Sequence, residues 1–252
     1  MRKERAAAYK SPSQRARVLS EGWAGDNLYC PCCPSNGLEC CANNREAIDF
    51  VCPSCDSAFQ LKSSRNSFGR RILDGAFSAM ARAIQSGATP NLIMLRYDSL
   101  SWTARDLVFV PNFAFTMSSI EQRPALTATA RRAGWIGCNI LICNVPIDLR
   151  IPMISAGEVL PAQDVRRRYQ SIKSLQTIRP EQRGWTLDVL NIVRRIGRAE
   201  FNLADVYEYC AELETLHPNN RHIRDKIRQQ LQRLRDLGFL EFSNVGVYRL
   251  LR

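Results

Sequence analysis

Asp49, Gln60 and Lys62 have the types and the spacing that metal-dependent hydrolysis of a phosphodiester requires. Such hydrolysis needs a cation to absorb the charge that develops on the phosphate, and a group that acts on the attacking water. Asp49 would be the anionic ligand of Mg²⁺ or Mn²⁺, because these cations prefer oxygen ligands. The Gln60 amide and the Leu61 carbonyl would add two oxygens, and Lys62 would orient or deprotonate the water. A polar strand face without any ligand is the competing interpretation of so short a pattern.

A second candidate metal site consists of two C-x-x-C pairs separated by eighteen residues, a spacing typical of structural zinc sites. Four thiolates close the coordination shell and leave no position for water, so we expect the zinc to be structural rather than catalytic. Three further cysteines, Cys32, Cys40 and Cys41, make the choice of the first pair less certain. The expected ligands are Cys30, Cys33, Cys52 and Cys55.

The charge of the chain favours a polyanionic partner. Its 252 residues include 35 Lys and Arg against 24 Asp and Glu, a formal net charge of +11. This balance is typical of proteins that bind nucleic acid or an anionic membrane. Because no stretch resembles a basic membrane anchor, nucleic acid is the better candidate. A basic protein without such a partner is the simpler alternative.

The location of the protein also follows from composition. The N-terminal residues lack the apolar segment of a secretory signal, and no run approaches the roughly eighteen apolar residues of a membrane span. We therefore expect a cytoplasmic protein, in which clustered cysteines bind metal instead of forming disulfides. We also expect a monomer in solution.

Two short strands must position the candidate catalytic residues. Residues 47–51 and 58–62 alternate between apolar and polar side chains, and the C-P-S-C knuckle between them is expected to make the turn. If the strands pair as a hairpin, Asp49 lies roughly opposite Gln60. The period of two then places Gln60 and Lys62 on one face of the hairpin. The zinc would act as a staple that holds this hairpin.

The surrounding segments predict an α/β core with a mixed sheet. Apolar spacing indicates a helix from Ser11 to Trp23 and another over residues 72–85, with Gly87 at the end of the second. The apolar runs 91–97 and 106–110 are expected to be central strands. A basic helix and a linker are expected between residues 161 and 180.

A Gly-rich segment that precedes the strand-like run near residue 140 carries two arginines beside a tryptophan. Arg131 and Arg132 suit contact with phosphate, and Trp135 suits contact with an exposed base. The alternative, to which the pattern gives equal weight, is a buried tryptophan with two solvated arginines.

From residue 181 onward the pattern predicts a winged-helix domain of three helices and a terminal hairpin around Asn244 and Gly246. The third helix, near 220–237, would enter the major groove, and its glutamines could read adenine edges. A solvated basic face is the alternative. The expected DNA contacts are Arg221, Arg224, Arg228, Gln229, Gln230 and Gln232. The expected domains are therefore 1–180, a nuclease domain, and 181–252, a DNA-binding domain.

Seven segments of the chain, in this order, resemble the adenine-methyl-dependent restriction endonucleases of the Dam-replacing family, to which DpnI gives its name. They are YKSPSQRARVL (9–19), DFVCPSC (49–55), QLKS (60–63), DGAF (74–77), TARRAGWIGCNI (129–140), RGWT (183–186) and HIRDKIRQQLQRLRD (222–236). The resemblance implies a PD-(D/E)xK nuclease core with a structural zinc, followed by a winged helix. It also implies double-strand cleavage at GATC with methylated adenine, and recognition of the methyl group by both domains.

The resemblance transfers Asp49 and Lys62 directly onto the catalytic pattern, whereas Gln60 stands where the relatives carry glutamate. Glutamine keeps one oxygen ligand and removes one negative charge, so metal affinity should fall. Glu46 is a candidate for compensation, although its odd spacing from Asp49 would place it on the opposite strand face. Two other functions therefore stay open: a methyl-adenine DNA-binding protein with a weakened nuclease site, and a zinc-containing winged-helix transcription factor.

Overall fold

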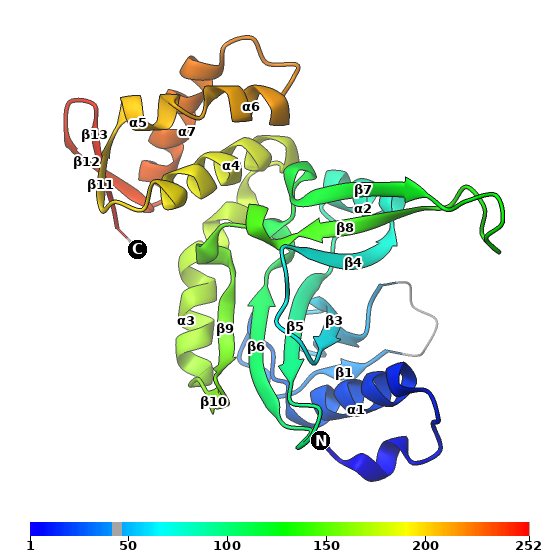
Figure 1. The fold of residues 1–252 in the computed structure, drawn as a ribbon. Helices are drawn as coiled ribbons and strands as arrows, with labels where there is room; N and C mark the ends of the chain where they lie inside the picture. Colours follow the sequence, from blue (N-terminus) through cyan, green and yellow to red (C-terminus); the bar gives the residue numbers. More distant parts are fainter. Residues whose placement is uncertain (42–46, 252) are drawn as a thin grey trace.

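The computed structural model describes residues 1–41 and 47–251. Its larger N-terminal part is built on a mixed sheet of seven strands (Figure 1). In spatial order the strands are β1 (Glu39–Cys40), β2 (Phe50–Val51), β3 (Ala58–Ser64), β5 (Asn91–Tyr97), β6 (Ala104–Val110), β9 (Ile151–Ser155) and β10 (Glu158–Val159). Only β3 and β5 run parallel among these pairs. The predicted mixed α/β core is confirmed.

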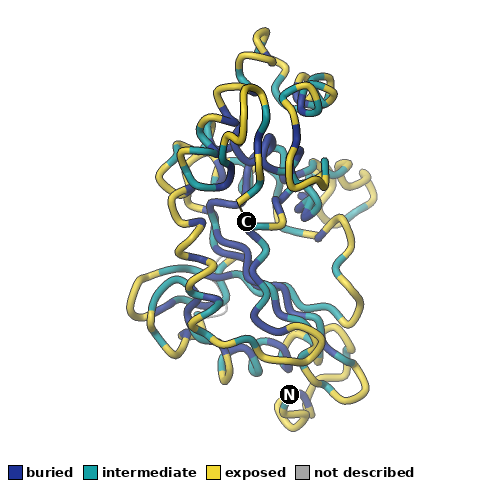
Figure 2. The backbone as a smooth tube through the Cα atoms, turned by 90° about the vertical axis from the view of Figure 1, so that its left-hand side faces the viewer, coloured by how far each residue is buried: buried dark blue, intermediate teal, exposed yellow. Residues whose placement is uncertain are grey.

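The core of this part lies along the central strands. All residues of β5 except Arg96 are buried, as expected of a strand covered on both faces. Helix α1 (Pro12–Asn27) packs against β3, and α3 (Ala162–Ile172) packs against β9 near the other side of the sheet. Buried backbone accordingly concentrates in the strands, with exposed loops around them (Figure 2). The 3-10 helices are η1 (Lys3–Ala6), η2 (Asn112–Ala114), η3 (Met117–Ser119), η4 (Ile142–Asn144), η5 (Ile147–Leu149) and η6 (Lys173–Thr177).

A second, antiparallel sheet has the order β4-β8-β7 and is made of β4 (Arg71–Ala76), β8 (Ile136–Leu141) and β7 (Ile120–Ala125). Helix α2 (Phe77–Ser86) packs against β8 and ends at Gly87, which has the left-handed φ of 72°. The prediction of a helix from residue 72 was wrong for its first turn, because residues 71–76 pair with β8 instead. The β7–β8 hairpin projects away from the rest of the molecule (Figure 1).

The C-terminal part has the predicted order of helices followed by a hairpin. It contains α4 (Pro180–Ile196), α5 (Leu203–Tyr207), α6 (Cys210–Leu216), α7 (Ile223–Asp236) and the sheet β11-β13-β12, formed by β11 (Glu200–Asn202), β12 (Leu240–Asn244) and β13 (Val247–Leu250). The second predicted helix is divided into α5 and α6, and its predicted cap, Asn202, forms a capping box with Asp205. The winged-helix arrangement is confirmed, with β11 as an additional strand.

Helix α4 joins the two parts of the molecule. Asp188 accepts a hydrogen bond of 2.5 Å from Ser118 of η3, and Arg194 forms an ion pair with Asp148 of η5. Both carboxylate side chains are nearly inaccessible to solvent. The helical part is therefore packed against the N-terminal part, while a domain boundary at residue 180 stays a prediction. No helix within the described ranges is long and apolar enough to cross a membrane.

Candidate active site

Asp49 directly precedes β2 and lies opposite Gln60. The strand register pairs Phe50 with Phe59, and the Asp49 N–H donates to the Phe59 carbonyl at 2.9 Å. The Asp49 carboxylate then accepts a 2.7 Å hydrogen bond from the Leu61 N–H through Oδ2. A strand residue directs its N–H and C=O to the same side, so the Leu61 carbonyl faces the Asp49 side as well. Three expected metal-binding groups thus lie around one point of the hairpin.

Gln60 and Lys62 occupy the same strand face and both reach a residue that sequence reasoning missed, Asp74. Its Oδ1 accepts hydrogen bonds from Lys62 Nζ at 2.7 Å and from Gln60 Nε2 at 3.1 Å. The Asp74 side chain is only 6% exposed, and that of Lys62 is 24% exposed. The only sequence signal for Asp74 was its place in the DGAF segment of the resemblance, which says nothing of its contacts.

Asp74 is brought to this position by β4 of the second sheet. The pairing of β4 with β8 shifts by one residue between Asp74 and Ala76, so that Gly75 is the extra residue of a bulge. Bulges bend a strand and redirect neighbouring side chains. Cys138 of β8 pairs with Asp74, and burial, together with the negative charge of Asp74, raises the pKa of the Cys138 thiol to about 11. The thiol is therefore neutral at pH 7 and is no candidate nucleophile.

The candidate catalytic residues open into a cleft bounded by α1. A cavity of about 400 Å³ is lined by Asp49, Gln60, Leu61 and Lys62 on the hairpin side, and by Ser13, Ala16, Arg17, Ser20 and Glu21 on the helix side. A second cavity of about 500 Å³ shares Ser13 and Ala16 with the first, so the two cavities are neighbours along α1. Together the two cavities line α1 on the side of the candidate catalytic residues.

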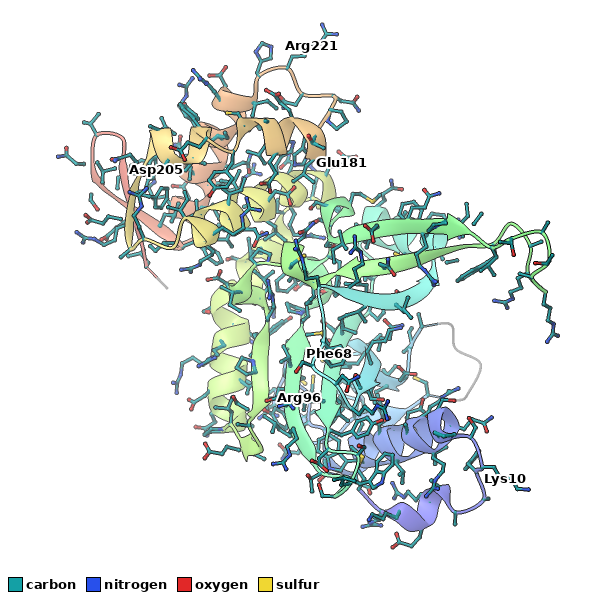
Figure 3. All side chains as sticks on the ribbon, viewed as in Figure 1. Lys10, Phe68, Arg96, Glu181, Asp205 and Arg221 are labelled. Atoms are coloured by element: carbon teal, nitrogen blue, oxygen red, sulfur yellow. The ribbon has the colours of Figure 1, made fainter. Side chains whose placement is uncertain are left out.

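This second cavity is strongly basic. Lys10, Arg15 and Arg65 line it, and none of the three forms an ion pair with another residue of the described ranges. Arg65 follows β3, which carries Lys62, and Lys10 points outward beside α1 (Figure 3). The two cavities therefore extend from the candidate catalytic residues to unneutralised positive charge.

The four predicted zinc ligands gather at the turn between β2 and β3. The sulfurs of Cys30, Cys33, Cys52 and Cys55 all lie within 4.8 Å of one another. The Sγ–Sγ distance is 3.7 Å between Cys30 and Cys55 and 3.5 Å between Cys33 and Cys52. With Zn–S bonds of about 2.3 Å, a tetrahedral site has sulfurs about 3.8 Å apart, so the cluster fits a structural zinc.

The first knuckle is attached to α3 by Arg166. The Arg166 guanidinium donates to the carbonyls of Cys30 and Ser35 at 3.1 Å and 2.8 Å, and it lies over the Tyr29 ring. The three arginines of α3 were expected to form a basic helix, and Arg166 instead serves the zinc site. The four-cysteine cluster thus connects the β2–β3 hairpin to a helix far away in the sequence.

The candidate DNA contacts of the projecting hairpin lie in the loop between β7 and β8. Arg131 and Arg132 are exposed, whereas Trp135 is half-buried and lies outside the hydrophobic core of the described residues. The Trp135 ring covers Gly137, where an added Cβ would come within 2.9 Å of it. A fully buried tryptophan, the alternative interpretation, is not what the structure shows. The ring and both arginines are available on one projecting arm.

The candidate DNA contacts of the C-terminal part lie on or just before α7. Arg221, Arg224, Arg228, Gln229 and Gln232 are all exposed. Arg228 pairs with Asp225 and also donates to the Tyr207 hydroxyl at 3.2 Å, while Arg224 lies over the Tyr207 ring. Arg221 extends into solvent from the loop before the helix (Figure 3).

Gln230 does not belong to this surface. Its side chain is fully buried and its Oε1 accepts a 2.8 Å hydrogen bond from the Thr186 hydroxyl of α4. The expectation that it reads adenine was wrong, because it faces the same side of α7 as Ile227 and Leu231. Glu46, considered above as a compensating acid, lies outside the described residues.

Comparison with protein families assigns both parts of the chain. Residues 1–178 match the family model of the Dam-replacing family, DpnI, and residues 181–250 match the model of the Dam-replacing HTH domain. Together the two matches span nearly all of the chain, and they meet where α4 begins.

Proposed function

The chain belongs to the Dam-replacing family, DpnI, and we propose that it cleaves duplex DNA at GATC sites with methylated adenine. Membership of this family implies a methyl-dependent restriction endonuclease. The observation that carries the proposal is the meeting of Asp49, Gln60 and Lys62 in one cleft. These strand positions correspond to the catalytic pattern of PD-(D/E)xK nucleases, with the amide of Gln60 in place of the second carboxylate.

Each group of the site has a role in this reaction. A bound Mg²⁺ or Mn²⁺ would supply charge neutralisation at the scissile phosphate and activation of water. Asp49 would hold the ion through Oδ1, which accepts no hydrogen bond within the described ranges, together with the Gln60 and Leu61 oxygens. Lys62, whose Nζ donates a hydrogen bond to Asp74, would orient or deprotonate the attacking water and stabilise the phosphorane-like charge.

Recognition of the methylated site is assigned to two surfaces. The projecting hairpin offers Trp135 for contact with the base and its methyl group, with Arg131 and Arg132 for neighbouring phosphates. Helix α7 offers Arg221, Arg224, Arg228, Gln229 and Gln232 to the major groove, where the N6 position of adenine is displayed. The two surfaces belong to different parts of the chain, in keeping with recognition by both.

One incubation tests the function. Plasmid from an adenine-methylating strain and the unmethylated copy are treated with the protein, with Mg²⁺ and with Mn²⁺. We expect fragments at GATC positions from the methylated plasmid alone. Cutting of both plasmids would contradict methyl dependence. A Lys62→Ala variant should abolish cutting, whereas Lys173→Ala, at an exposed position of η6, should not alter it.

A second candidate function is binding of methylated DNA without cleavage, because Gln60 carries an amide where the family pattern has a carboxylate. It would be favoured by a gel shift selective for methylated DNA with no nicking in either metal. A shift independent of methylation would instead favour a zinc-containing transcription factor.

A further inference from the structure

Asp74 is the feature of the nuclease site that neither the family pattern nor the sequence assigns a role. We propose that Asp74 is a positioning residue of this site, which orients the Gln60 amide so that its oxygen is available to the catalytic metal. The inference rests on the proposed function, because it concerns how the same site holds its cation.

The orientation follows from hydrogen-bond chemistry. An ionised carboxylate only accepts hydrogen bonds, whereas an amide has one end that donates and one that accepts. Because Asp74 Oδ1 lies 3.1 Å from the Gln60 side chain, the amide must turn its Nε2 toward Asp74. The opposite rotation would bring two acceptors together in a site where the Asp74 side chain is 6% exposed. Gln60 Oε1 is thereby turned away from Asp74.

This orientation matters for glutamine and not for glutamate. A glutamate presents an oxygen whichever way its side chain is turned, whereas a glutamine turned the wrong way presents an N–H to the cation. A chain with Gln60 therefore depends on a partner that fixes the amide, and Asp74 is that partner among the described residues. Lys62, bound to the same Oδ1 at 2.7 Å, keeps the Asp74 oxygen in place.

The bulge in β4 brings the Asp74 carboxylate to Gln60. Asp74 stands on a different sheet from Gln60 and Lys62, and the additional residue Gly75 in β4 lets its carboxylate reach across. The hydrogen bond between Gln60 and Asp74 thus depends on the packing of one sheet against the other. The backbone of β3 alone does not determine which way the Gln60 amide is turned.

A double-mutant cycle tests the proposal. Asp74→Asn can offer its own N–H₂ to Gln60 and no longer enforces one amide orientation. We expect it to lower cleavage of methylated plasmid by about 10- to 100-fold, as loss of a partner of a metal ligand commonly does. In a Gln60→Glu background the same substitution should cost several-fold less, because glutamate needs no orientation. Equal losses in both backgrounds would overturn the proposal and leave Asp74 a purely structural residue or a ligand itself.

A second readout separates this inference from the proposed function. Binding of Mn²⁺ to the free protein, followed by electron paramagnetic resonance, should be weakened by Asp74→Asn in the Gln60 chain and little changed in the Gln60→Glu chain. This pattern is expected even if wild-type protein cuts no DNA, a result that would contradict the proposed function alone. Asp106→Asn is the matched control, because it removes the charge of another ion-paired aspartate, the partner of Arg96, and it should change neither Mn²⁺ binding nor cleavage.

Discussion

In the proposed site, Gln60 is the residue on which binding of the divalent cation depends most. Its amide oxygen can replace one oxygen of the glutamate that the family pattern has there, but it brings no charge. Asp49 is then the one anionic ligand among the groups that we assign to the metal, and the affinity for the cation depends on it. Because the net charge of the ligands is the main difference, the consequence should appear as a dependence on metal concentration.

The substitution Gln60→Glu tests this at the residue scale. We expect faster cleavage of methylated plasmid at limiting Mg²⁺, since a second carboxylate attracts the cation, and similar rates when Mg²⁺ is saturating. Initial rates over a Mg²⁺ titration measure the effect. An unchanged rate at limiting Mg²⁺ would place Gln60 outside the metal shell.

Trp135 is the residue whose removal should affect discrimination most. If its half-buried ring contacts the methylated base, Trp135→Ala loses a stacking contact worth about 1–3 kcal/mol. The ratio of cleavage rates on methylated and unmethylated duplexes should therefore fall, while Trp135→Phe retains part of it. If Trp135→Ala leaves the ratio unaltered, the ring serves only to cover Gly137.

Among the secondary-structure elements, α1 is the one along which we expect the DNA to enter the proposed site. The two cavities along it extend from the candidate catalytic residues to Lys10, Arg15 and Arg65, which have no ion-pair partners in the described ranges. Each contact with a phosphate releases counterions from the DNA, so the affinity falls as the salt concentration rises. The logarithm of the binding constant falls with the logarithm of the salt concentration with a slope of about 0.9 per contact. Arg15→Gln and Arg65→Gln should each lower affinity at low salt and reduce that slope.

Binding to methylated duplex can be measured in Ca²⁺ across a salt series. Arg168→Gln, an exposed arginine of α3, provides the control, because α3 packs on β9 near the other side of the sheet. Equal slopes for wild type and the Arg15 and Arg65 variants would show that the DNA backbone does not follow α1.

Zinc bound by the four-cysteine cluster would stabilise the β2–β3 hairpin as a whole. Removing one thiolate, as in Cys55→Ser, should release the metal and loosen the turn that sets the register of Asp49 against Gln60. We expect less than one zinc per chain, a lower unfolding temperature and loss of cleavage even in excess Mg²⁺. Cys210→Ser, in the C-terminal helices, should keep full zinc content. Full activity without zinc would contradict the role of a staple.

On the scale of the whole molecule, α4 holds the two parts together through the pair of Arg194 and Asp148. Both side chains are largely buried, at 16% and 7% exposed, so Arg194→Ala leaves an unpaired buried charge and should destabilise the junction by roughly 3 kcal/mol. Calorimetry should show a lower unfolding temperature for the whole protein, or a separate unfolding transition for the C-terminal part.

The neighbouring Arg195 offers the matched control for this measurement. It pairs with Glu212 within the C-terminal part, and both side chains are about two-fifths exposed. Exposed pairs contribute at most about 1 kcal/mol, so Arg195→Ala should change the transition little. Equal effects of the two variants would show that the junction does not depend on the buried pair.

The sequence was informative wherever local pattern decides structure. The expected hairpin is present with Asp49 opposite Gln60, but of the predicted strand 47–51 only Phe50 and Val51 form β2. The strand β4 escaped prediction because it is paired with β8, more than sixty residues later, while its own residues carry the apolar spacing of a helix. Asp74 could not be recognised for the same reason, since its contacts depend on a bulge in that distant pairing. Gln230 was misjudged because its neighbours on α7 are exposed amides.

The pairing of β4 with β8 has a kinetic consequence. Strand β8 begins at Ile136, one residue after Trp135, and its Cys138 is the partner of Asp74. Trp135 is assigned to the methyl group, and Asp74 orients Gln60. The two are connected by the first three residues of β8 and by the pairing of Cys138 with Asp74. If contact of a base with the ring shifts β8, we expect the paired Asp74 to shift with it. Methylated and unmethylated sites should then differ in kcat more than in KM, and the enzyme would reject a wrong site after binding it.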